Sequence, residues 1–150
     1  MSLTSVPPMP RLLGLLGLIP FLIGGLGVWV EALGDLRFAL PILVLAHGAL
    51  IASFLGGVRW GAAMQNNKSD SQPRHLVMAI VPSLIALVAF MLPITQAFGL
   101  LIVLFIAQAV LDITASDNGD LMAWYKPLRI WLSVIACASM ASLMLHGLTH

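Results

Sequence analysis

The amino-acid sequence predicts an all-α integral membrane protein, a compact bundle of five transmembrane helices forming one domain over residues 1–150. Composition is the first reason. Of the 150 residues, 60% are hydrophobic and only 9% are charged, whereas soluble domains carry about 25% charged residues. The second reason is the presence of five apolar segments of helical length, and the third is the one-sided placement of lysine and arginine. A mean hydropathy of +1.02 agrees with lipid as the main solvent.

The five predicted spans follow from the length of helix that crosses the hydrocarbon, about 20 mainly apolar residues. The segments that qualify are residues 12–30, 41–64, 76–92, 97–112 and 127–145. The second is the longest, and at a rise of 1.5 Å per residue it measures about 36 Å. A helix longer than the hydrocarbon is thick tilts or protrudes, so we expect one of these for the second span.

The first apolar segment is predicted to stay in the protein as a helix. Arg11 followed by an apolar run resembles the start of a secretory signal peptide. However, the run over residues 12–30 is longer than the apolar core of such a peptide, and no small-residue cleavage site ends it. We therefore expect a membrane span here and a short irregular tail before it.

Prolines mark expected helix starts and bends. Pro41 and Pro127 stand at the beginning of the second and fifth predicted spans, where the first helical turn needs no backbone N–H. Pro20 and Pro82 lie inside the first and third spans. Each removes one backbone hydrogen bond, so we expect these two helices to bend.

Lysine and arginine positions predict the orientation of the bundle. With five spans, the N-terminal tail shares one side of the membrane with the second and fourth connections. Six of the seven basic residues fall on that side, namely Arg11, Arg59, Lys68, Arg74, Lys126 and Arg129, and only Arg37 falls on the other. Basic residues favour the cytoplasmic side. The prediction is a bacterial inner-membrane protein with a cytoplasmic N-terminus and a periplasmic C-terminus.

Small residues recur every four positions on the second span and predict close helix packing. The stripe consists of Ala49, Ser53, Gly57 and Gly61, and it ends in a GxxxG pair. Small residues allow helix backbones to approach within a membrane. Packing within the bundle is the simpler interpretation, and homo-oligomerisation through the second helix is the alternative.

Arg59 and Asp112 are predicted to form an ion pair between helices. Arg59 lies five residues before the expected end of the second span, which places it about 7–8 Å inside that end. Asp112 ends the fourth predicted span on the same side of the membrane. A buried charge is costly without a partner, so depth and sign together favour a pair.

Two further polar residues, His47 and Gln108, lie within the predicted spans. Gln108 and Asp112 are four positions apart and share one helix face, and His47 precedes Arg59 by just over three turns. If these faces meet, the four residues line a polar interior that could serve as a proton or anion path or as a small polar ligand site. The alternative is ordinary packing, in which His47 donates to a carbonyl and Gln108 bridges two helices.

Several classes of function lack their sequence signatures. We find no phosphate-binding loop, no Ser/His/Asp order and no HExxH motif. The lone Cys137 cannot form an intrachain disulfide, and no Cys/His spacing suits zinc. A net charge of +1 gives no electrostatic basis for nucleic-acid binding. We therefore expect no catalytic residues, no metal and no cofactor.

Five blocks of sequence carry a resemblance to a known family. They are RLLGLLGLIPF (11–21), HGALIASFLGGVRWG (47–61), VPSLIALVAFMLP (81–93), LD (111–112) and WYKPLRIWL (124–132). The chain resembles, over nearly its whole length, the membrane family called domain of unknown function 3429. The resemblance implies a compact five-helix membrane protein, and it brings no established activity or site residues.

The expected function is that of a small, non-enzymatic membrane protein. It would act as an accessory or structural subunit, or bind a hydrophobic small molecule between its helices. Membrane lipids, a second copy of the chain or another membrane protein would be its partners. The alternative is a small oligomeric transporter or channel that uses the face with His47, Arg59, Gln108 and Asp112.

Overall fold

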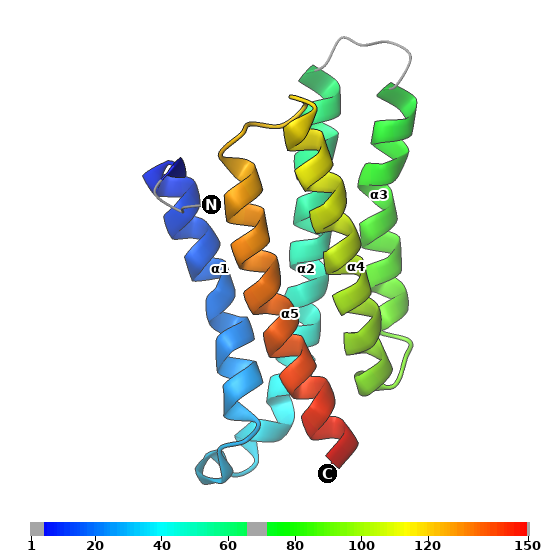
Figure 1. The fold of residues 1–150 in the computed structure, drawn as a ribbon. Helices are drawn as coiled ribbons and strands as arrows, with labels where there is room; N and C mark the ends of the chain where they lie inside the picture. The colour runs from blue at the N-terminus through cyan, green and yellow to red at the C-terminus, as the bar shows by residue number, and fades with distance from the viewer. Residues whose placement is uncertain (1–4, 66–71, 150) are drawn as a thin grey trace.

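A computed structural model describes residues 5–65 and 72–149, and of residues 72–75 only the backbone. Within this part of the chain, five long α-helices run alternately in opposite directions (Figure 1). They are α1 (Pro8–Gly27), α2 (Leu36–Gln65), α3 (Gln72–Ala89), α4 (Ile94–Asp117) and α5 (Tyr125–Thr149), with a short 3-10 helix, η2 (Glu31–Leu33), before α2. The prediction of an all-helical membrane protein is confirmed at this level.

Four of the described helices, α1, α2, α4 and α5, are long and apolar enough to cross a membrane. The apolar part of α3 is shorter, Leu76–Ala89. Helix α1 ends at Gly27, three residues before the end of the predicted span, because the chain there turns through successive backbone hydrogen bonds from Val28, Trp29 and Val30.

Two helix ends differ from the prediction. Helix α2 begins at Leu36, so Pro41 lies inside the helix rather than in its first turn; neighbouring helices allow such prolines in membrane helices. Pro127 does lie in the first turn of α5. Helix α4 continues to Asp117, more than a turn beyond Asp112, and the Thr114 hydroxyl donates to the Val110 carbonyl on the way.

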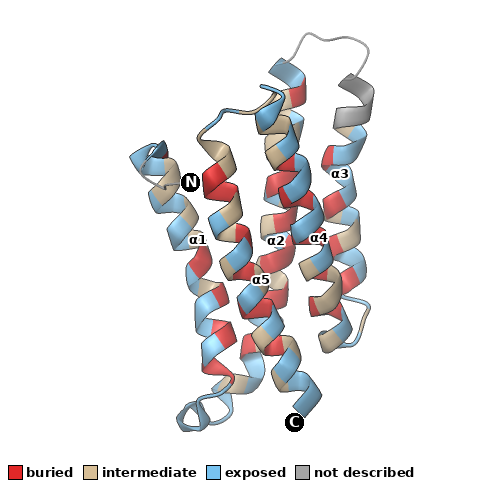
Figure 2. Cartoon of the chain, in the orientation of Figure 1, coloured by how far each residue is buried: buried red, intermediate tan, exposed pale blue. Residues whose placement is uncertain are grey.

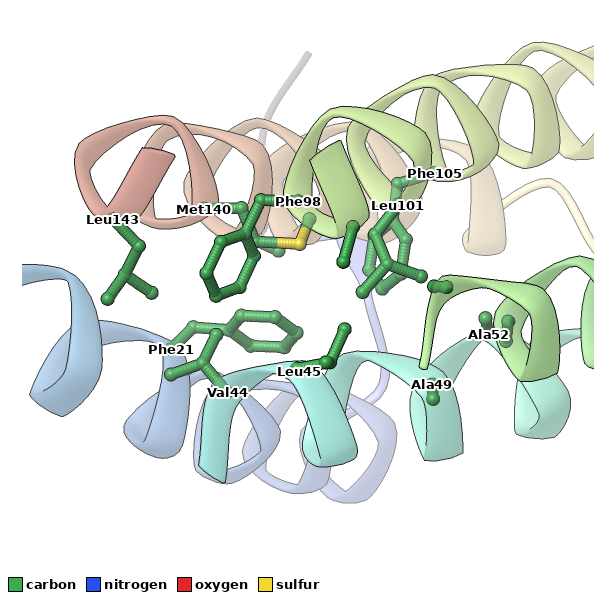
Figure 3. Close-up of a cluster of buried hydrophobic side chains, with 14 of the residues drawn as sticks. Phe21, Val44, Leu45, Ala49, Ala52, Phe98, Leu101, Phe105, Met140 and Leu143 are labelled. Carbon is green, nitrogen blue, oxygen red and sulfur yellow. The ribbon is translucent and has the colours of Figure 1, made fainter. Parts of the chain in front are cut away.

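The core is a layer of large apolar side chains between four helices. Figure 3 shows Phe21 of α1, Val44 of α2, Phe98 of α4 and Met140 of α5 pointing toward one another, and each is at most 1% exposed. Helix α4 packs against α2, α3 and α5, while α1 packs against α2 and α5. The outward faces remain apolar and exposed, as suits contact with lipid (Figure 2).

Ala49 of the predicted stripe is buried in the core, but the other close-packing small residues of α2 lie one position away from that stripe. Gly48, Ala52 and Gly56 are buried, and a Cβ on Gly56 would overlap the carbonyl oxygen of Ala79 on α3. The space around Gly57 and Gly61 is open. The predicted packing within the bundle is therefore wrong for these two glycines, because α2 turns Gly56, and not Gly57, toward α3.

Substitution of Gly56 tests this packing. Gly56→Ala should lower the stability in mild detergent by about 1–3 kcal/mol, because a backbone carbonyl cannot yield to the new methyl group. The matched control, Gly57→Ala, adds the same methyl group to open space and should leave the stability unchanged. Thermal unfolding followed by circular dichroism measures both. Equal stability of the two variants would contradict the packing described.

Candidate functional site

The buried polar centre of the bundle is one carboxylate shared by two guanidinium groups. Asp112 of α4 is 1% exposed. Its Oδ1 accepts a hydrogen bond from Arg59 Nε at 2.7 Å, and its Oδ2 accepts one from Arg129 Nε at 2.9 Å. The predicted Arg59–Asp112 pair is therefore present. The carboxylate ties together three helices, since Arg59 belongs to α2 and Arg129 to α5.

Arg129 is a member of this cluster that sequence reasoning missed. It lies in the second turn of α5 and is 3% exposed. Its Nη1 donates to Ser133 Oγ at 2.8 Å, one turn further along the same face, and its guanidinium carbon lies 5.8 Å from the centre of the Phe105 ring. From the sequence, Arg129 was predicted only to be one of the basic residues on the cytoplasmic side. The signal available was Ser133, a small polar residue four positions later in an apolar segment.

The cluster holds more positive than negative charge. Arg59 and Arg129 contribute two cations, and Asp112 contributes one anion. Arg59 keeps 12% of its side chain exposed, so part of its charge can reach polar surroundings. Arg129 has no such outlet, and its Nη2 is buried without a hydrogen-bond partner among the described residues. An excess cation in a buried site costs several kcal/mol unless an anion approaches it.

Tyr125 lies against the same carboxylate. It is the first residue of α5, one turn before Arg129. Its hydroxyl is buried beside Asp112, which is the acceptor nearest to hand. Buried polar groups in native proteins are nearly always paired, so the unpaired Arg129 Nη2 remains the donor of the site that needs a partner.

His47 does not join the cluster. Its Nε2 lies 2.8 Å from the carbonyl oxygen of Gly17 on α1, to which it donates, and its ring packs edge-on against Phe21. Twelve residues of helix turn about 120° beyond three full turns, so His47 and Arg59 face different neighbours. The expectation that His47 lines the same polar interior is corrected, and its bond to a carbonyl is the packing role named as the alternative.

Gln108 also serves helix packing. Its Nε2 donates to the Ala52 carbonyl of α2 at 3.1 Å. It shares a face of α4 with Asp112, as predicted, and both are buried. Gln108 therefore bridges two helices in the way the alternative interpretation expected.

An apolar cavity of about 540 Å³ lies beside the charged cluster. Helices α1, α2 and α5 supply most of its wall and α4 adds Phe105. Three of the lining residues have side chains with polar groups, and they come from the start of α5 and the loop before it: Trp124, Tyr125 and Arg129. Ligand sites in proteins are cavities of this size with a few convergent polar groups. The cavity and the cluster share Arg129 and Tyr125, and together they form the candidate site.

A double-mutant cycle tests the central ion pair. Asp112→Ala should destabilise the protein by about 3–5 kcal/mol, since it leaves two buried cations without a counter-charge. Arg59→Ala should cost less, because Asp112 keeps Arg129. The two losses should be non-additive by at least about 1 kcal/mol, measured by unfolding in detergent.

The control cycle uses Asp117 and Lys126, whose ion pair is partly exposed. Their coupling should stay below about 1 kcal/mol, because solvent screens surface pairs. Additive losses at Arg59 and Asp112, or a coupling no larger than that of the control pair, would show that the buried pair does not hold the helices together.

Comparison with known proteins gives the family. Residues 6–145 match the family model described as Protein of unknown function (DUF3429). The chain is 36% identical to transmembrane protein 69 of Xenopus tropicalis over 155 aligned positions, which cover 97% of this chain and 57% of the relative. The chain thus spans little more than half the length of that curated relative. No solved structure matches it. The chain belongs to the DUF3429 family of membrane proteins, as the sequence blocks predicted.

Proposed function

We propose that this protein is a non-enzymatic, multi-pass membrane protein that binds a hydrophobic small molecule in the cavity between α1, α2 and α5. The observation that carries the proposal is the cavity itself, about 540 Å³ in volume and lined almost wholly by apolar side chains. Such a space in a membrane protein stays filled with hydrocarbon rather than water, because apolar walls offer water no hydrogen bonds. The protein would then have an accessory or structural role, and the bound molecule would be a lasting part of its functional form.

The wall of the cavity suggests how a ligand enters. Gly17 lines the cavity, and no described atom outside its own stretch of helix lies within 4 Å of the place where its Cβ would stand. Leu13 on α1 and Phe54 on α2 also line the cavity and are exposed on the outside of the bundle. A hydrophobic molecule dissolved in the bilayer would therefore reach the cavity sideways, between α1 and α2.

Binding is favoured over transport because the predicted polar path is divided. His47 contacts α1, whereas Gln108 and Asp112 contact α2 from the other side. Binding is favoured over catalysis because both oxygens of Asp112 are held by arginines. Each oxygen of this carboxylate is already engaged by a guanidinium donor, so neither is placed to take a proton from a substrate.

We further propose five spans, with the N-terminus in the bacterial cytoplasm. Support comes from helix direction, since α2 and α4 run the same way and the chain has to return between them along α3 (Figure 1). It also comes from charge. Arg59 lies in the last two turns of α2, and Lys126 and Arg129 lie in the first two turns of α5, whereas Arg37 lies at the start of α2. The end of α2 and the start of α5 lie at the same end of the bundle (Figure 1). A second copy of the chain or another membrane protein is the proposed partner, and the open space at Gly57 and Gly61 leaves room for a helix.

Reporter fusions test the orientation. A C-terminal phosphatase fusion, active only outside the cytoplasm, should be active in bacteria, and a C-terminal fluorescent protein that matures only in the cytoplasm should stay dark. The reverse pattern would overturn the five-span assignment. A fusion after Gln65, at the end of α2, serves as the internal control because it should show the opposite activity.

Filling the cavity tests the binding function. Native mass spectrometry of the unaltered protein should show a hydrophobic ligand that co-purifies with it. Gly17→Phe places a ring where the wall is open and should abolish this co-purification. Gly57→Phe adds the same ring to open space outside the cavity and should leave that ligand in place. Both variants should fold, as judged by circular dichroism. If Gly17→Phe retains the same ligand as the unaltered protein, the cavity is not the binding site.

A further inference from the structure

We propose that the occupant of the cavity is an anionic phospholipid of the surrounding bilayer, with an acyl chain along the apolar wall and its phosphate at Arg129. This inference rests on the proposed binding function and adds the chemical class of the ligand. Three features of the site carry it: an uncompensated buried cation, an unpaired donor on that cation, and the order of polar and apolar groups along the cavity.

The charge balance of the site calls for an anion. Arg59 and Arg129 share the single counter-charge of Asp112. Arg129 forms part of the cavity wall and is 97% buried, the complement of its 3% exposure. Attraction between unlike charges strengthens as the surrounding dielectric falls, so an oxyanion at this end of the cavity gains more than it would at an exposed arginine. A neutral hydrophobic ligand would leave the excess positive charge of the site without a counter-charge.

One donor of Arg129 is left over for an oxyanion. Arg129 Nε and Nη1 are used within the bundle, by Asp112 and by Ser133, which fixes the guanidinium plane. Nη2 remains without a hydrogen-bond partner among the described residues, whereas the Tyr125 hydroxyl has the Asp112 carboxylate beside it. Nη2 is buried, so the fold has already met the cost of desolvating it. An oxyanion entering from the cavity forms charge-assisted hydrogen bonds, the stronger kind.

The shape of the cavity matches a lipid lying in one leaflet. Helices α1 and α5 begin at the same end of the bundle (Figure 1). Tyr125 and Arg129 lie at that end, while the apolar wall of α1 continues from Pro10 to Phe21, about 16 Å at the rise of an α-helix. The basic residues near that end place it where lipid head groups are expected. A lipid in the leaflet therefore meets the polar end with its head group and the apolar wall with its chain.

A lipid-retention experiment tests the inference. The protein is reconstituted in bilayers with equal amounts of phosphatidylglycerol and phosphatidylcholine that carry the same acyl chains, then extracted in mild detergent. Native mass spectrometry counts the lipids that remain bound. The expected result is one retained lipid, with phosphatidylglycerol enriched about tenfold, the size expected of one hydrogen bond to a charged group.

Two variants separate head-group binding from chain binding. Arg129→Gln removes the cation and the unpaired Nη2, so it should remove the phosphatidylglycerol enrichment. Tyr125→Phe leaves Arg129 in place and should keep the enrichment. Because Arg129→Gln also takes a partner from Asp112, its folding is checked by circular dichroism, and equal retention of the two lipids by the unaltered protein overturns the inference by itself. Lys126→Gln, which removes a cation from the same turn of α5 but outside the cavity lining, is the matched control and should keep the enrichment.

The outcomes distinguish this inference from the binding function beneath it. Equal retention of both lipids, lost in Gly17→Phe, would overturn the anionic head group while the cavity remains a binding site. Unchanged enrichment in a folded Arg129→Gln variant, or loss of the enrichment in Lys126→Gln, would assign the preference to surface charge and overturn the inference. Lipid retention that Gly17→Phe does not alter would overturn the binding function itself.

Discussion

The arrangement of this bundle depends on the carboxylate of Asp112, which two arginines from different helices share. In a bilayer there is no hydrophobic force between apolar helices, so polar contacts and close packing decide how they associate. Asp112 binds Arg59 of α2 and Arg129 of α5 through separate oxygens. The helices α2, α4 and α5 are thereby held at one relative height. The same sharing leaves one cation in excess, and the structure places it against a cavity.

Small residues complete the packing in the membrane-embedded part and also decide where the cavity opens. On α1, a Cβ at Gly25 would lie 2.9 Å from the Ser139 Cα, so α1 and α5 meet backbone to backbone there. The Ser142 hydroxyl donates to the Gly25 carbonyl at 2.7 Å and accepts from the Trp29 indole, which strengthens this contact. Two turns earlier, around Gly17, the neighbouring side chains stand further away. The close contact and the open cavity are thus consequences of the same glycine-rich helix.

Much of the candidate site was predictable, and the errors have one physical origin. The depth of a residue in the membrane follows from counting 1.5 Å per residue, so the pairing of Arg59 with Asp112 could be expected from depth and sign. The direction in which a side chain points depends on how each helix is rotated about its axis. That rotation is set by packing between helices, so the sequence suggested one common face for His47 and Arg59 where the structure has two. The packing row on α2 was displaced by one residue for the same reason.

The sequence by itself determined the membrane environment, the five helical segments and the side on which basic residues gather, because each depends on local composition and helix length. It could also indicate that Arg59 needed a partner, since a lone charge in lipid is costly. Only the tertiary structure decided that Arg129 is buried rather than at the surface, that α4 continues past Asp112, and that a cavity lies beside the cluster. These features depend on which helix faces meet, and close packing among four or more helices settles that question collectively.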